Sequence, residues 1–424
     1  MTSNAETGTQ AARLLLLLAA CSLFPGAGAT AGKTDLADAA ERNDAEQIQE
    51  LLKQDANVNA AQVDGMTALH WTVYQDDLES SRRLIKAGAS VGTANRYGVR
   101  PLSLACMNGN PAIVELLLKS GADPNTTLRG GETVLMTAAR TGKLQPVQAL
   151  LARGAEVDRK ERNGQTALMW AAAEGHAKVA ETLIKQGADF RVALKSGFNA
   201  FFFAAREGKA DVARVLLRAG ADVNEGMRVQ QGVHKGPKTG TSALFLAVEN
   251  GHFEFAVELL KAGANPNDQR GGFTALHAIT WVRKPNRGDG PDGDPPPIGS
   301  GKLNSLQFVR KLIASGADVN LRLKRGQSGR GRLNRTGATV FLLAAKTADV
   351  PLMRLLLELG ADPSTANADG CTPLMAAAGV GTLAPGEEAG TEAEAVSAVI
   401  MMLELGADVN ARDANGETAM HGAA

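Results

Sequence analysis

Residues 163–189, "NGQTALMWAAAEGHAKVAETLIKQGAD", hold two helix patterns and two helix-ending signals in one short stretch. The hydroxyl of Thr166 suits the cap of a short first helix, and the small residues after it allow a second helix to pack closely. That second helix carries apolar residues at helical spacing, including Val179 and Leu183. Gly187 suits the left-handed position that ends a helix. The stretch therefore predicts a helix–turn–helix unit followed by a hairpin-like turn.

The end of this unit returns every 33 residues between residues 55 and 222, and at wider spacings after that. Triplets of the Gly-Ala-Asp kind stand at 55–57, 88–90, 121–123, 154–156, 187–189, 220–222, 263–265, 316–318, 360–362 and 406–408. A second phrase keeps the same register, as in "DGMTALHW" at 64–71, "GGFTALHA" at 271–278 and "DGCTPLMA" at 369–376. A fixed period of this length indicates a protein built from stacked repeats.

The period and the Thr-x-Leu phrase resemble the ankyrin repeat family, with its T-P-L-H-x-A signature, over residues 33–424. The resemblance implies an all-α solenoid of about ten helix–loop–helix repeats with hairpin fingers, plus a partial eleventh. It also implies protein–protein binding through a concave face lined by fingers and first helices. The expected repeats are 33–63, 64–96, 97–129, 130–162, 163–195, 196–238, 239–270, 271–335, 336–368, 369–413 and the partial 414–424.

The two ends of the repeat region differ in polarity. The first repeat, with "TDLADAAERNDAEQIQELLKQ" at 34–54, is unusually polar and reads as a cap. The last residues, Asn415 to Ala424, end inside the first helix of the eleventh repeat. We therefore expect either a fragment or a missing C-terminal cap, and a catalytic domain beyond Ala424 stays open.

The first 29 residues read as an export signal. Residues 14–24, "LLLLLAACSLF", are too short for a membrane span and follow Arg13. The small-residue pattern at 27–29 predicts cleavage after Ala29, whereas "LAAC" at 18–21 resembles a bacterial lipoprotein box with lipid on Cys21. Both alternatives predict an exported bacterial protein, periplasmic or secreted in the first case and an outer-membrane lipoprotein in the second.

Composition and motifs argue against catalysis. Lys plus Arg equals Asp plus Glu at 45 each, so net charge favours neither nucleic acid nor acidic substrates. The three cysteines show no metal-ligand spacing, and the catalytic and nucleotide-binding motifs are absent. We expect no catalytic residue, no cofactor and no metal site.

The histidines and cysteines fall at structural positions of the repeat. His70, His277 and His421 follow Thr-x-Leu, and His176 and His252 follow the glycine that ends a first helix. We expect these five to bond to neighbouring backbone, and His234 to lie in a solvated inserted loop. Cys106 and Cys371 are about seven repeats apart, too far for a disulfide, and are expected to be packing residues.

One position of the first helix is predicted to face the groove, seven residues after the capping residue. Trp71, Leu104 and Trp170 stand three residues earlier and are expected in the core. The candidates for partner contact at the groove position are Tyr74, Met107, Arg140, Arg206, Trp281 and Lys346.

Four insertions break the 33-residue pattern. Two lie in finger turns, 225–239 and 321–336, and two lie between the helices of one repeat, 283–302 and 379–394. The insertion at 321–336 contains no acidic residue and adds these basic candidates for partner contact: Arg322, Lys324, Arg325, Arg330, Arg332 and Arg335. The insertion at 379–394 contains Glu387, Glu388, Glu392 and Glu394. Since the resemblance to ankyrin repeats places the two kinds of connection at opposite ends of the helices, we expect a basic finger edge and a more acidic opposite edge.

Proline and glycine crowd residues 285–301, "PNRGDGPDGDPPPIGSG". Helix patterns on both sides make this stretch an insertion inside one repeat, and its aspartates do not have the spacing of an EF-hand loop. The Arg-Gly-Asp triplet at 287–289 is interpreted as a coincidence.

The sequence thus predicts a monomeric, non-catalytic scaffold that binds a protein partner through its groove and fingers. The alternative is a binder of polyanions or nucleic acid through the basic fingers, although the absence of aromatic residues among those arginines argues against base stacking. Contact with a membrane is expected only through a lipid on Cys21.

Overall fold

A computed structural model describes residues 35–233, 236–285, 297–326, 332–382 and 390–423 of the chain. The predicted signal segment with Cys21 and Ala29 lies outside these ranges, as do His234, the triplet at 287–289, Arg330, Glu387 and Glu388. Within the ranges the structure is all-helical, with isolated β-bridges such as that of Thr127 with Thr133 between the helices. The predicted fold class is confirmed.

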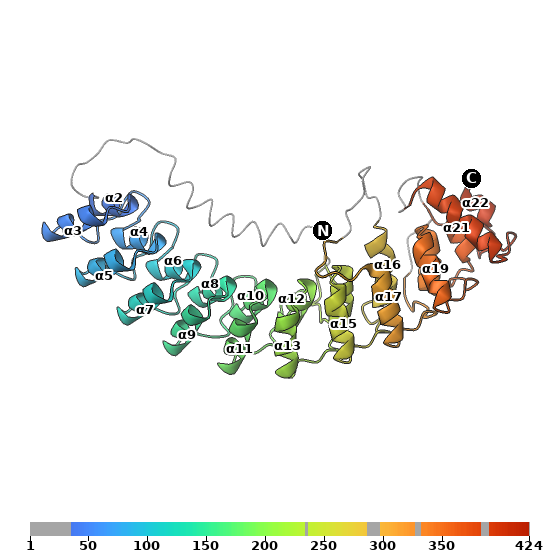
Figure 1. Ribbon diagram of the computed structural model, residues 1–424, viewed down its shortest axis with the longest axis horizontal. Coiled ribbons are helices and arrows are strands. Elements are labelled where there is room, and N and C mark those ends of the chain that lie inside the picture. The colour runs from blue at the N-terminus through green and yellow to red at the C-terminus, as the bar shows by residue number, and fades with distance from the viewer. Residues whose placement is uncertain (1–34, 234–235, 286–296, 327–331, 383–389, 424) are drawn as a thin grey trace. The chain divides into compact units, whose positions relative to one another are not determined.

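The helices alternate between two kinds, and pairs follow one another along the chain (Figure 1). The first helices are α2 (Asp35–Glu41), α4 (Ala68–Tyr74), α6 (Pro101–Asn108), α8 (Val134–Thr141), α10 (Ala167–Glu174), α12 (Ala200–Arg206), α14 (Ala243–Glu249), α16 (Ala275–Arg283), α18 (Val340–Lys346), α20 (Pro373–Ala377) and α22 (Ala419–Ala423). The second helices are α3 (Ala45–Lys53), α5 (Leu78–Lys86), α7 (Pro111–Lys119), α9 (Leu144–Ala152), α11 (Ala177–Lys185), α13 (Ala210–Arg218), α15 (Phe253–Lys261), α17 (Ser305–Ala314), α19 (Val350–Glu358) and α21 (Glu392–Glu404).

The signals in residues 163–189 act as the sequence predicts. The Thr166 hydroxyl accepts the Met169 amide at 3.4 Å and caps α10. Gly175 and Gly187 end α10 and α11 with φ of 91° and 92°, a backbone conformation that costs little only for glycine. Residues of the repeat itself therefore determine where its helices begin and end, without contacts from neighbouring repeats.

Packing between helix pairs builds two layers. The described residues divide into two compact blocks, one up to Arg96 and one from Tyr97 onward. In the second block each first helix packs on the next first helix, as α8 does on α10, and each second helix packs on the next second helix, as α7 does on α9. In the first block α2 packs on α4 and α3 on α5 in the same way. Since one pair cannot bury its own apolar faces, the neighbouring pairs supply the core.

An asparagine in the fingers connects successive repeats. The Asn125 side chain donates to the Gly154 carbonyl at 3.1 Å and accepts the Glu156 amide at 2.8 Å, so one amide satisfies two backbone groups of the next repeat. The same pair of hydrogen bonds is made by Asn59, Asn224, Asn267 and Asn320. The Asn after Gly-Ala-Asp thus fixes the register between fingers.

The two insertions within helix pairs make contacts between repeats. In the insertion at 283–302, the backbone lies against the preceding repeat, where the Lys302 amide donates to Glu254 at 2.7 Å. Lys284, in the same insertion, binds Glu394 at 2.5 Å. Glu394 of the acidic insertion therefore has a basic partner, which the insertion at 283–302 supplies.

The most buried ion pair in the described ranges joins the eighth and ninth repeats. Arg283 donates to both carboxylate oxygens of Asp349, at 2.6 and 2.9 Å, and the Asp349 side chain is 0% exposed. Asp349 also accepts the Leu352 amide and so caps α19. One carboxylate therefore stabilises both a helix start and an interface between repeats.

Replacing Asp349 by alanine is expected to cost about 3–5 kcal/mol in free energy of unfolding, because it leaves the largely buried Arg283 guanidinium without its partner. Urea unfolding followed by circular dichroism measures this loss. The control is Glu358→Ala, which removes an exposed pair with Arg310 and is expected to cost less than about 1 kcal/mol. Equal effects of the two substitutions would contradict the assignment.

Candidate partner-binding face

The groove residues predicted from the sequence lie in the last turns of the first helices. We call the side of the second block that these turns and the fingers form the first-helix face. Its predicted residues are all half-buried: Met107, Arg140, Arg206, Trp281 and Lys346. Tyr74 holds the same position in the first block, where it is 36% exposed and meets the edge of Trp71 at 6.0 Å between ring centroids.

Arginines on this face lie over aromatic rings of the same face. The Arg140 guanidinium is 5.5 Å from the centre of the buried Trp170 ring. Arg206 is 5.0 Å from the Phe198 ring and 5.1 Å from the Phe203 ring, and it also pairs with Glu207 at 2.8 Å. These contacts hold the guanidinium groups in place through the attraction between a cation and an aromatic ring.

Trp281 lies in a cluster of three aromatic rings. Its ring centre is 5.1 Å from that of Phe273, edge to face, and 6.2 Å from that of Phe245. Arg335 from the finger insertion lies 5.9 Å from the centre of the Phe273 ring. The sequence analysis missed Phe245 and Phe273, although Phe245 stands where other repeats have the histidine of Thr-x-Leu-His.

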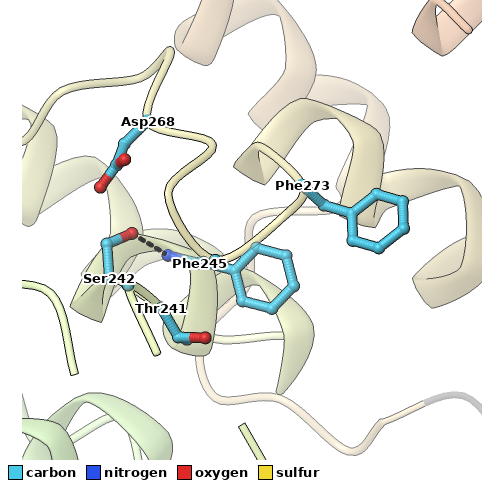
Figure 2. A pocket seen from close by; sticks show the side chains of 7 residues that line it. Thr241, Ser242, Phe245, Asp268 and Phe273 are labelled. Atoms are coloured by element: carbon cyan, nitrogen blue, oxygen red, sulfur yellow. Dashed lines mark hydrogen bonds between the residues drawn. The ribbon is translucent and has the colours of Figure 1, made fainter. Parts of the chain in front are cut away.

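A small crevice lies beside this cluster. Figure 2 shows its lining side chains, with the Ser242 hydroxyl accepting the Phe245 amide at 3.2 Å. Phe245 and Phe273 both line the crevice, and its volume is about 10 Å³, the space of roughly one water molecule. The crevice is therefore too small for a ligand, and any binding here uses the surface of the rings.

Glu249 is a third residue that was not predicted from the sequence. It is the last residue of α14 and holds the groove position of the seventh repeat. It is half-buried, and burial raises the pKa of its carboxyl. Within the described ranges its side chain makes no hydrogen bond or ion pair, unlike Arg206 one repeat earlier.

The finger insertion at 321–336 continues the hairpin of its finger. Leu323 and Ala338 pair at its base, with the Leu323 amide donating at 3.0 Å, and the Arg335 amide donates to the Gly326 carbonyl at 2.9 Å. The hairpin then crosses the first-helix face, since the Leu333 amide donates to the carbonyl of Gly381 at 3.2 Å, beyond the end of α20.

The sequence predicted a basic finger edge and an acidic edge at opposite ends of the helices. This prediction is wrong for the insertion at 321–336. Leu333 is 7% exposed and packs in an apolar cluster with Leu323, Leu343, Met375 and Val380. Burial of Leu323 and Leu333 draws the hairpin from the finger side onto α18 and α20. The insertion at 321–336 thus contacts the insertion at 379–394.

This hairpin uses some of its basic residues internally. Arg322 donates to the carbonyls of Gly337 at 3.0 Å and Ala366 at 2.9 Å, and Arg335 lies over Phe273. Lys324, Arg325 and Arg332 are exposed. Of the groove candidates, Lys346 is also engaged, with its ammonium donating to the Val380 carbonyl at 3.4 Å and to the Thr382 hydroxyl.

The described histidines have structural contacts. His70, His277 and His421 bond to the capping threonine of their own helix. His176 and His252 each bond a carbonyl of the preceding repeat at 2.9 Å, on Arg140 and Arg206 respectively. The five therefore take part in caps and contacts between repeats.

Both described cysteines are buried free thiols, Cys106 and Cys371. Burial raises the pKa of the Cys106 thiol and raises that of Cys371 to about 12. Both thiols are therefore protonated at neutral pH and pack as small apolar groups.

A second hollow lies between residues 297–305, which follow the insertion's proline-rich part, and the end of α16. It is lined by Arg283, Ser300 and Ser305 among others. Arg283 binds Asp349 and Ser305, and the Ser300 amide donates to His252 at 3.1 Å. Because its polar groups are engaged within the fold, the hollow offers little to an anion.

The residues that the structure describes contain neither a membrane-spanning helix nor a cluster of metal-binding side chains. Their helices lack the combination of length and apolar character that a bilayer-spanning helix needs. Among the same residues no three His, Cys, Asp or Glu side chains gather as they would around a metal ion.

Comparison with protein families matches the repeats directly. A model described as "Ankyrin repeats (3 copies)" matches residues 36–128, 120–193 and 135–227, and one described as "Ankyrin repeat" matches 239–270 and 369–414. The chain belongs to the ankyrin repeat family. Among solved structures, the human ASB11 ankyrin repeat domain is similar, with a TM-score of 0.47 and 24% identity over 55% of this chain and 98% of that domain. No curated protein matches the sequence.

Shortening Leu333 to alanine is expected to release the hairpin from the first-helix face. A buried Leu→Ala substitution costs about 2 kcal/mol or more, which corresponds to roughly 30-fold faster local opening. Hydrogen exchange is expected to accelerate at residues 321–326 and 332–338 and to stay unchanged in α8. The control is Leu403→Ala on α21, whose side chain is 45% exposed. Unchanged exchange in the Leu333 variant would contradict the docking.

His277 is expected to make folding depend on pH. Burial lowers its pKa to about 4, whereas an unfolded histidine has a pKa of about 6.5. The unfolded chain therefore binds the proton first, so this stability is complete above about pH 6.5 and is lost as pH falls toward 4. Between pH 7 and 5 the loss is about 2 kcal/mol. His277→Asn is expected to remove this part of the difference in urea unfolding, and an unaltered difference would contradict it.

Proposed function

We propose that this ankyrin repeat chain is a non-catalytic scaffold that binds another protein through the first-helix face and the adjoining fingers. The observation that carries the proposal is the set of half-buried charged and aromatic side chains at one first-helix position of the fourth, sixth, seventh, eighth and ninth repeats. Ankyrin repeats generally act as protein-binding modules. Side chains fixed by ring contacts and ion pairs lose little entropy on binding, which favours affinity.

Site-specific cross-linking tests this function. A photoreactive residue placed at Met107 reports on the first-helix face, and one placed at Glu115, exposed on α7, reports on the opposite layer. The full chain is expected to yield a cross-linked protein from position 107 and none from position 115. Cross-links from both positions alike, or from position 115 only, would overturn the proposal.

The exposed basic residues of the hairpin support an acidic partner surface. Lys324, Arg325 and Arg332 project from a segment that is anchored by Leu323 and Leu333. A fixed group of like charges raises the association rate of an oppositely charged partner. Arg322 and Arg335 contribute mainly to the fold, because their guanidinium groups contact backbone and a ring.

Replacing Lys324, Arg325 and Arg332 by glutamine is expected to slow association with the captured partner by about tenfold at low salt, and to flatten its salt dependence. Surface plasmon resonance at several salt concentrations measures both effects. The control replaces the three exposed second-helix lysines Lys86, Lys261 and Lys311. The polyanion alternative would be favoured if the chain binds heparin, if the glutamine variant no longer binds it, and if no protein is cross-linked.

We also propose that the chain is exported. The support is the sequence of residues 14–29 alone, an apolar run followed by small residues. N-terminal sequencing of the cellular protein distinguishes the two forms: a start at Thr30 indicates cleavage after Ala29, and a blocked, lipid-labelled start at Cys21 indicates a lipoprotein. A retained Met1 would contradict both.

A further inference from the structure

Three arginines on the first-helix face supply a cation to aromatic rings of the same face. Arg140 lies over Trp170, Arg206 over Phe198 and Phe203, and Arg335 over Phe273. Arg140 and Arg206 occupy the groove position of the fourth and sixth repeats. The face therefore uses one kind of contact repeatedly, a guanidinium group over a ring.

The seventh repeat departs from this arrangement. Its groove position holds Glu249, an anion, where Arg206 stands one repeat earlier. The neighbouring rings of Phe245 and Trp281 contact each other at 6.2 Å, and no described side chain places a cation over either ring. Within the described residues, neither the two rings nor the carboxylate has the counterpart that the fourth and sixth repeats supply internally.

Helix geometry puts these three groups on one surface. Phe245 and Glu249 are four residues apart on α14 and so share one side of that helix. Trp281 occupies the groove position on α16, which packs directly on α14. Arg206, at the groove position of the preceding repeat, is paired with Glu207 at 2.8 Å. Among the described side chains, Glu249 thus has no cation paired with it, and it lies beside two half-buried rings.

We propose that Phe245, Glu249 and Trp281 form a binding site for an arginine side chain of the partner protein. The proposal rests on the proposed function and specifies what the partner presents to the seventh and eighth repeats. A planar guanidinium group can lie over the rings while its N–H groups donate to the carboxylate. Arginine is favoured over lysine because the internal contacts of this face also use guanidinium groups over rings.

The probe is the peptide acetyl-Ala-Gly-Arg-Gly-Ala-amide, compared with the same peptide containing citrulline, which keeps the shape and loses the charge. The chain has three tryptophans, so Trp281→Phe assigns the Trp281 indole N–H signal in a nitrogen-15 NMR spectrum. The arginine peptide is expected to shift this signal with a dissociation constant in the millimolar range, and the citrulline peptide to bind about tenfold more weakly. Equal binding of both peptides, or no shift with either, overturns the proposal.

Glu249→Gln is expected to weaken the arginine peptide at least about fivefold. The matched control, Glu174→Gln, removes an exposed carboxylate at the end of another first helix and is expected to leave binding unchanged. Phe245→Leu provides a second variant that keeps an apolar side chain and removes the ring. Unchanged affinity in both site variants, with native circular dichroism, overturns the site.

The cross-linking at position 107 separates this proposal from the general function. A protein captured at Met107 together with no response to the arginine peptide removes the arginine site and keeps the scaffold function. A specific response to the peptide without any captured protein keeps the site and removes the scaffold function.

Discussion

The packing of one helix pair on the next is the constraint on which the rest of this molecule depends. First helices such as α10 and α12 are short and rich in alanine, and nearly all their side chains are buried between neighbours. A pair with so little volume cannot form a core alone. Specificity between neighbours therefore comes from polar groups at the edges, namely the asparagine bonds of the fingers and the Arg283–Asp349 pair.

The same packing explains why the first-helix face can hold charged groups in fixed positions. The last turn of each first helix lies where the next helix pair covers it only in part, so long side chains there are half-buried. Arg140 and Arg206 rest on rings instead of extending into water. Since a half-buried charge loses hydration, each needs a compensating contact. Glu249 is the position where the described structure supplies none.

Local signals were sufficient to predict the repeat, and non-local contacts were not predictable. Thr166 and Gly187 act within a few residues, so their roles follow from sequence alone. Arg283 and Asp349 are 66 residues apart and belong to different repeats, with no pattern that connects them. Phe245 and Glu249 were missed because they replace the histidine and the long basic or aromatic side chain expected at their positions. The repeat period predicts which residues occupy equivalent positions. The contacts that each of these residues makes depend on the neighbouring repeats, and the period does not predict them.

The path of the 321–336 insertion could not be predicted from the sequence. Its arginines suggested an extended basic edge, but its two leucines decide its path, because burial of Leu323 and Leu333 outweighs solvation of the loop. The hairpin covers part of α18 and α20, whereas the rings of Phe245 and Trp281 on α14 and α16 remain partly exposed. The insertion thus limits the accessible part of the face near its C-terminal end. It also brings Arg335 to Phe273, beside the rings assigned to a partner arginine.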